Sequence, residues 1–81
     1  MSSIYSDEYQ MIIKTLRQAR LEKGITQVQL AKALSKPQSF VAKVENGERR
    51  LDVVEFVRIA RLLAVNPAEV IEMIGAGEEG L

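Results

Sequence analysis

Apolar residues recur at intervals of three and four positions along most of the chain, a spacing that places them on one face of an α-helix. No segment shows the sustained alternation of apolar and polar residues that is typical of a half-buried strand. The apolar pattern divides into blocks that are separated by glycine, proline and polar residues. It predicts an all-α fold with five short helices, over residues 7–23, 26–34, 37–45, 52–64 and 66–74.

The residues at the ends of these blocks have helix-capping chemistry. Thr26 is followed three residues later by Gln29, and Asp52 is followed at the same distance by Glu55. Each pair fits a capping box, in which each side chain bonds the backbone N–H of the other residue. Gly24 follows the first block, and glycine readily adopts the left-handed conformation that ends a helix. These local signals agree with the hydrophobic pattern.

The composition limits the size and the chemistry of the protein. Its 81 residues are enough for one domain, which we expect to span residues 1–74, followed by a flexible, acidic tail over residues 75–81. The chain has no cysteine and no histidine, which excludes disulfides, the usual zinc clusters and histidine acid–base chemistry. The longest apolar run, residues 62–65, is far below the ~20 residues of a membrane-spanning helix, and no signal-peptide pattern is present. We expect a cytoplasmic protein without a metal or cofactor.

The charges are unevenly distributed although the net charge is zero. Residues 24–50 carry five basic and two acidic side chains, whereas residues 51–81 carry two basic and six acidic side chains. A local basic surface attracts phosphate even when the whole chain is neutral. The middle of the chain is therefore the region in which a nucleic-acid interface is expected.

The second and third predicted helices are separated only by Ser35 and Lys36, which gives the spacing of a helix-turn-helix over about residues 26–46. In such a unit the second helix places its N-terminal residues against base edges in the major groove of DNA. Glutamine pairs well with adenine, lysine with guanine, and serine with either. The predicted third helix and its flanks carry suitable exposed polar residues, namely Lys36, Gln38, Ser39, Lys43 and Asn46.

Two runs of residues and the segment that follows them resemble a known family. The chain reads Gly24-Ile25-Thr26-Gln27-x-x-Leu30-Ala31-x-x-Leu34 and then Ser39-x-Val41-x-Lys43-Val44-Glu45-Asn46-Gly47. These runs, together with Leu62-x-x-x-Asn66-Pro67, are similar to the Cro/phage-repressor type of helix-turn-helix, also called the XRE family. The similarity covers roughly residues 10–74 and implies a compact five-helix, lambda-repressor-like DNA-binding domain.

The resemblance also implies roles for individual residues. It assigns base contacts to Gln38, Ser39 and Lys43, and a charge pair between the first and third helices to Arg20 and Glu45. Phe40 has two expected places, either near the DNA backbone or a thymine methyl group, or in the core. Gln27 is expected at a phosphate, or is only a helix-start residue. The other positions that resemble phosphate contacts are Asn46, Arg49 and Arg50.

The chain departs from the family pattern at Ser35 and Pro37. Many members carry glycine at the first position and a Ser or Thr cap at the second. Proline suits the first position of a helix, which predicts that the third helix begins at Pro37. Proline also disfavours helical geometry at Lys36, so the start of this helix, and whether Gln38 or Ser39 points deepest, stays open.

The expected function is that of a transcriptional regulator, a repressor that binds double-stranded DNA as a homodimer on a pseudo-palindromic operator. The dimer surface is expected in the region of the last two helices, at Val65, Val70, Ile71, Met73 and Ile74. The alternatives are a protein-interaction module, such as an antitoxin or adaptor, and a restriction–modification controller protein. An enzyme is not expected, since the chain has no obvious carboxylate pair and no glycine-rich phosphate loop.

Overall fold

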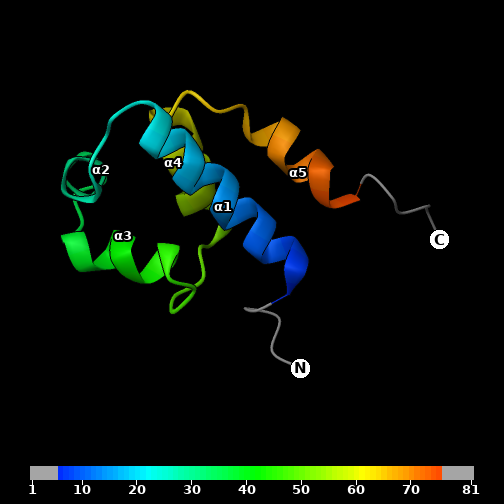
Figure 1. Cartoon of the computed structure of the whole chain (residues 1–81), viewed down its shortest axis with the longest axis horizontal. Helices are drawn as coiled ribbons and strands as arrows, with labels where there is room; N and C mark the ends of the chain where they lie inside the picture. The colour runs from blue at the N-terminus through cyan, green and yellow to red at the C-terminus, as the bar shows by residue number, and fades with distance from the viewer. Residues whose placement is uncertain (1–5, 76–81) are drawn as a thin grey trace.

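The computed structural model describes residues 6–75, and these residues form five helices and no strand (Figure 1). The helices are α1 (Asp7–Glu22), α2 (Gln27–Ala33), α3 (Gln38–Glu45), α4 (Val53–Leu62) and α5 (Pro67–Gly75). The all-α prediction is confirmed, and the helix ends differ from the predicted ones by one or two residues because the capping residues lie outside the hydrogen-bonded turns. Residues 76–81 of the expected tail lie outside the described residues.

Side-chain caps define the starts of α2 and α4. The Thr26 hydroxyl accepts from the Gln29 N–H at 3.0 Å, and the Gln29 Oε1 accepts from the Thr26 N–H at 2.9 Å. The same reciprocal bonds join Asp52 and Glu55, at 2.7 and 3.0 Å. The capping boxes predicted at Thr26 and Asp52 are therefore confirmed.

Several of the connections between helices pass through the left-handed region of backbone conformation. Gly24 and Gly47 have φ values of +67° and +79°, and both follow helices that the sequence predicted to end there. Ser35 and Ala64 adopt φ values of +58° and +57°, although each carries a Cβ that makes this conformation costly. Ser35 thus takes a left-handed conformation, which glycine adopts more readily than serine.

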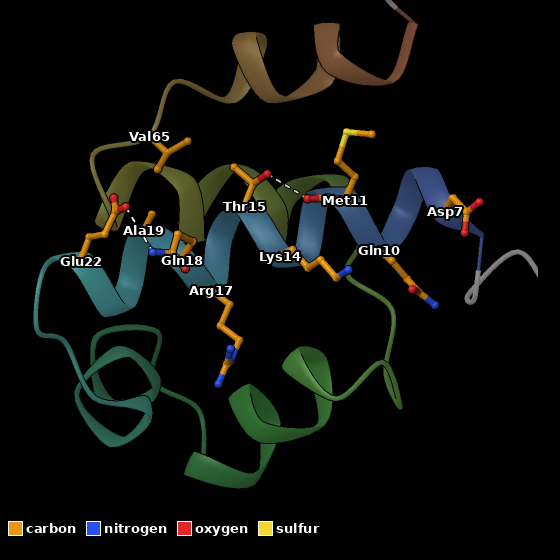
Figure 2. A pocket seen from close by; sticks show the side chains of 10 residues that line it. All are labelled: Asp7, Gln10, Met11, Lys14, Thr15, Arg17, Gln18, Ala19, Glu22 and Val65. Carbon is orange, nitrogen blue, oxygen red and sulfur yellow. Dashed lines mark hydrogen bonds between the residues drawn. The ribbon is translucent and has the colours of Figure 1, made fainter.

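The core lies between α1, the pair formed by α2 and α3, and α4, which contacts α2 and α5. Both views of the molecule place α5 on the side of α1 opposite to α2 and α3 (Figures 1 and 2). The most deeply buried side chains are Ala60 and Leu63, at 0 and 1 % exposure. The rest of the buried apolar core consists of Ile13, Leu16, Leu30, Ala31, Phe40, Val41, Val44, Phe56, Ile59 and Val70.

The position of Val70 corrects part of the expected dimer surface. Val70 is 2 % exposed and belongs to the core of the single chain, because it lies on the face of α5 that packs against α1 and α4. Val65 is half-buried against the same core, and Ile74 is half-buried as well. Only Ile71 and Met73, at 52 and 42 % exposure, present large apolar side chains of α5 to solvent. None of the described helices is long and apolar enough to cross a membrane.

Candidate nucleic-acid interface

The turn between α2 and α3 is held by backbone hydrogen bonds. The Ser35 N–H donates to the Lys32 carbonyl at 3.0 Å, and the Lys36 N–H donates to the Ala31 carbonyl at 2.9 Å. Pro37 has extended backbone angles and is the N-cap of α3, so the prediction that it begins the helix is wrong by one residue. Since proline has no side-chain acceptor, α3 starts without a side-chain cap.

The start of α3 at Gln38 orients its residues with respect to solvent. Gln38, Ser39 and Lys43 are exposed, as are Lys36 before the helix and Asn46 after it. Val41 and Val44 point into the core, at 2 and 4 % exposure. The structure therefore leaves five of the expected DNA-contacting residues accessible to solvent in and beside α3.

A buried ion pair lies directly behind this surface. Arg20 of α1 makes two hydrogen bonds to the Glu45 carboxylate of α3, Nε to Oε2 at 2.7 Å and Nη2 to Oε1 at 2.9 Å, and both side chains are only 8 % exposed. The third donor of Arg20, Nη1, bonds the Ile25 carbonyl at 2.8 Å. This is the pairing that the resemblance implied, and it fixes α3 against α1 and the start of α2.

The ion pair continues into a line of amide hydrogen bonds. Gln27 Nε2 donates to Glu45 Oε1 at 2.9 Å, and Gln38 Nε2 donates to Gln27 Oε1 at 2.7 Å. Gln27 is half-buried and both ends of its amide bond other side chains of the chain. Its side chain therefore positions Gln38, a role that sequence reasoning missed, whereas its expected phosphate contact stays a prediction.

Phe40 lies in the core, at 8 % exposure, so its expected place near the DNA backbone is corrected in favour of the alternative. Two cations lie over its ring, with Lys36 Nζ at 5.3 Å and Arg49 Cζ at 4.6 Å from the centroid. Sequence spacing alone did not separate these two places, because Phe40 is adjacent to the core residue Val41 and to the exposed Ser39.

Arg49 makes contacts within the chain, and its expected phosphate contact stays a prediction. Its Nη1 and Nη2 donate to the two carboxylate oxygens of Glu55, at 3.0 and 3.1 Å, and Nη1 donates in addition to the Arg50 carbonyl at 2.8 Å. The hydrogen bonds between the two side chains raise the pKa of Arg49 and lower the pKa of Glu55. The guanidinium is thus bound within the chain.

Arg50 and Tyr9 hold the loop between α3 and α4 against α1. The Arg50 guanidinium lies over the Tyr9 ring, 5.0 Å from its centroid, and the Leu51 N–H donates to the Tyr9 hydroxyl at 3.1 Å. The sequence predicted Glu55 only as part of a helix cap and predicted no contact between Tyr9 and this loop. Tyr9 and Leu51 are 42 positions apart, and Arg49 and Glu55 meet across a non-helical segment, so neither contact carries a local signal.

A wide, open hollow lies along α1 and is lined by residues of α1 together with Val65 (Figure 2). Its charged side chains, which include Asp7, Lys14, Arg17 and Glu22, spread along α1 and point in different directions rather than converging on one point. Among the described residues no group of three or more acidic side chains is placed to hold a metal ion. We assign the helix-turn-helix face, and not this hollow, as the functional site.

Comparison with known proteins agrees with this fold. A helix-turn-helix family model matches residues 16–70 of the chain. A solved structure of an XRE-family like protein from Pseudomonas syringae pv. tomato str. DC3000 is 43 % identical and has a TM-score of 0.80, covering 89 % of this chain and 88 % of that one. The search of curated proteins found no match. The chain therefore belongs to the XRE family of helix-turn-helix proteins, which are DNA-binding transcription regulators.

Proposed function

We propose that the protein is a sequence-specific repressor that binds a pseudo-palindromic operator as a homodimer, with α3 of each subunit in the major groove. The observation that carries the proposal is the hydrogen bond from Gln38 to Gln27, because it holds an exposed glutamine in one orientation at the start of α3. A side chain that is held in place before binding loses less conformational entropy when it pairs with a base.

The buried ion pair sets the direction of this hydrogen bond. The ionised Glu45 carboxylate only accepts hydrogen bonds, so Gln27 turns its NH₂ group toward Glu45 and its oxygen toward Gln38. Gln38 must then give one N–H to Gln27, which leaves its own oxygen and its second N–H for a ligand. One acceptor beside one donor matches the N6 and N7 edge of adenine, and such a pair contributes about 1–3 kcal/mol of discrimination.

Two other exposed residues extend the base-reading surface. Ser39 follows Gln38, and Lys43 lies one turn further along the same helix. Lysine suits the O6 and N7 acceptors of guanine, and serine suits several bases. We assign base contacts to these three residues, and phosphate contacts to Lys36, Asn46 and Arg50, which flank them.

The exposed apolar residues of α5 and the start of α4 support a homodimer. Besides Ile71 and Met73, Val53 and Val54 at the start of α4 are exposed, at 75 and 66 %. Ile71 and Val53 line one small groove, whose other lining residues are the largely apolar Tyr9, Ile12, Leu51 and Phe56 and the charged Arg50 and Asp52. Because α5 lies on the side of α1 away from α3, contact through this patch leaves α3 accessible (Figure 1).

A second copy also solves a problem of specificity. One DNA-binding module of this kind buries roughly 600–1,000 Å² of protein surface, which is small for a specific complex. Two modules related by two-fold symmetry read two half-sites whose centres are about 34 Å apart. A dimer bound in this way represses transcription by occupying DNA that the polymerase must reach.

Selection of bound duplexes from a random pool tests the proposal. We expect inverted repeats with centres about 34 Å apart, and a position whose preference for adenine is lost in Gln38→Ala. Lys43→Ala should relax a second position, whereas Arg61→Ala, a change of an exposed cation at the end of α4, should relax none. Repression is measured with a reporter gene placed behind the selected site. Single, non-repeated sites together with a monomer in sedimentation would contradict the homodimer.

A further inference from the structure

We propose that Arg49 is a positioning residue for base recognition, which acts by clamping the first turn of α3 to the first turn of α4 through Phe40 and Glu55. It does not act as the phosphate contact that its place in the sequence suggests. The inference rests on the proposed function for one of its two tests, since that test measures binding to the selected duplex.

The first turn of α3 needs such support because it lacks a side-chain cap. In α2 and α4 a capping box satisfies the free N–H groups and fixes the first turn. In α3 the N-cap is Pro37, which contributes only its carbonyl, as acceptor for the Phe40 N–H at 2.9 Å. The residues that read bases, Gln38 and Ser39, belong to this same turn.

In the absence of a side-chain cap, Phe40 provides the side-chain contact that holds the first turn of α3. It directly follows Ser39, so the place of its ring determines how the preceding two residues face the groove. The ring is buried on the core side, and the Arg49 guanidinium lies over it at 4.6 Å, within the range of a cation–π contact. Arg49 thus holds the ring of Phe40 from the side of the loop.

Glu55 fixes Arg49 in turn. Its two oxygens accept from Nη1 and Nη2 of Arg49, and Oε1 also accepts from the Asp52 N–H as part of the cap of α4. A bidentate pair with a planar guanidinium sets its orientation as well as its position. The chain of contacts therefore runs from the cap of α4, through Arg49, to the first turn of α3.

A DNA phosphate would have to compete with this arrangement. Glu55 already binds both terminal nitrogens of Arg49, and Nη1 also bonds the Arg50 carbonyl. The carboxylate neutralises the guanidinium and would repel a phosphate placed beside it. The clamp and the phosphate contact consequently predict opposite effects when the charge of Glu55 is removed.

The first experiment measures the Kd of Glu55→Gln for the selected duplex and for a scrambled duplex. If Arg49 contacts phosphate, removal of the neighbouring negative charge tightens binding to both duplexes. If Arg49 is a clamp, binding to the selected duplex weakens at least about fivefold while binding to the scrambled duplex does not weaken. Glu48→Gln is the matched control, because it removes an exposed carboxylate from the same loop.

Salt dependence gives a second measure in the same assay. Log affinity falls as log salt concentration rises. Loss of one phosphate contact in Arg49→Gln would reduce the steepness of this fall by about 0.9, whereas loss of the clamp leaves the steepness unchanged. An unchanged salt dependence together with weaker binding to the selected duplex supports the clamp, and a shallower salt dependence overturns it.

The second experiment does not require DNA. Hydrogen exchange in Glu55→Gln is compared with wild type at the Phe40 N–H, which bonds Pro37, and at the Leu63 N–H, which bonds Ile59. The clamp predicts that exchange at Phe40 accelerates more than exchange at Leu63. Equal acceleration at both sites would overturn the clamp. Failure of the wild-type protein to select any operator would defeat the proposed function instead, and it would leave this exchange test unaffected.

Discussion

Nε2 of Gln38 donates a hydrogen bond to Oε1 of Gln27 at 2.7 Å, and this bond joins the first turns of the two helices of the helix-turn-helix. Gln27 is bonded in turn to Glu45, which is paired with Arg20. The orientation of the exposed Gln38 amide, which we propose reads a base, is thus linked to a buried ion pair.

Loss of Gln27 should act through Gln38. In Gln27→Ala the Gln38 side chain loses its hydrogen-bond partner, so the preference for adenine should fall by about 1 kcal/mol. The effects of Gln27→Ala and Gln38→Ala should not add in the double variant, because both remove the same oriented amide. The double-mutant cycle is obtained from the Kd values of the four proteins for the selected duplex and for a duplex in which the adenine is replaced. Additive effects of the two substitutions would contradict the coupling.

Removal of the Glu45 charge should destabilise the fold strongly. Glu45→Gln leaves the Arg20 guanidinium buried beside a neutral partner, which costs roughly 3–5 kcal/mol of unfolding free energy. Arg17→Gln is the control, because Arg17 lies 3.8 Å from the same carboxylate but its side chain is 56 % exposed. An exposed pair of this kind contributes less than about 1 kcal/mol. Urea denaturation measures both variants, and similar losses would contradict the buried role of Arg20.

The Arg49–Glu55 pair should make stability depend on pH in the acidic range. Hydrogen bonding to Arg49 and to the Asp52 N–H, with Lys36 nearby, lowers the pKa of Glu55 below its ordinary value of 4.5. The folded state therefore gains stability from the ionised carboxylate above that value, and loses it as the pH falls through the lowered pKa.

Comparison with Glu55→Gln isolates this contribution. The difference in unfolding free energy between wild type and Glu55→Gln should be constant above about pH 5.5 and should shrink as the pH falls below the ordinary carboxyl pKa. Glu48→Gln controls for the loss of a negative charge from the same loop. Parallel curves for wild type and Glu55→Gln throughout the acidic range would show that the pair does not stabilise the fold.

Ser35→Gly should stabilise the protein. Ser35 has a φ of +58°, a conformation that disfavours a residue with a Cβ but not glycine. The expected gain in unfolding free energy is about 0.5–1 kcal/mol, after subtraction of the greater entropy of glycine in the unfolded chain. Ser39→Gly, in the first turn of α3, should instead destabilise. Thermal unfolding of the two variants should therefore shift in opposite directions.

Ile71→Asp should dissociate the proposed dimer. A carboxylate in the middle of an apolar contact is left without a partner, so the dimer loses affinity while the monomer, in which Ile71 is 52 % exposed, still folds. Leu21→Asp, at an exposed position near the end of α1, is the control and should not change the oligomeric state. Sedimentation equilibrium gives the mass, and circular dichroism verifies that helix content is retained.

The sequence predicted the helices better than the contacts between them. Periodicity and capping boxes lie within a few residues of one another, so Thr26 with Gln29 and Asp52 with Glu55 could be recognised without a structure. The exposed residues Gln38, Ser39 and Lys43 followed from the same periodicity once α3 was placed. The predicted start of α3 at Pro37 was one residue too early, because the fixed φ of proline suits both the N-cap and the first helical position.

Contacts across the loop between α3 and α4 were not predictable in this way. Arg49 and Glu55 are separated by a non-helical segment, where sequence spacing does not determine which side chains meet. The burial of Phe40 depends on that same loop, and the burial of Val70 depends on how α5 is placed on α1 and α4. These positions require the tertiary arrangement, which local patterns do not contain.

The hydrogen bonds from Gln38 to Gln27 and from Gln27 to Glu45 all run in one donor-to-acceptor direction. This direction has a consequence for how operator preference can evolve. An uncharged residue in place of Glu45 would allow both glutamine amides to rotate by half a turn, so that Gln38 offers a different order of donor and acceptor to the groove. If Arg20 is replaced by an uncharged residue at the same time, so that no buried charge is left unpaired, such a regulator could acquire a new target sequence through changes that never touch DNA, while every residue on its proposed reading surface is kept.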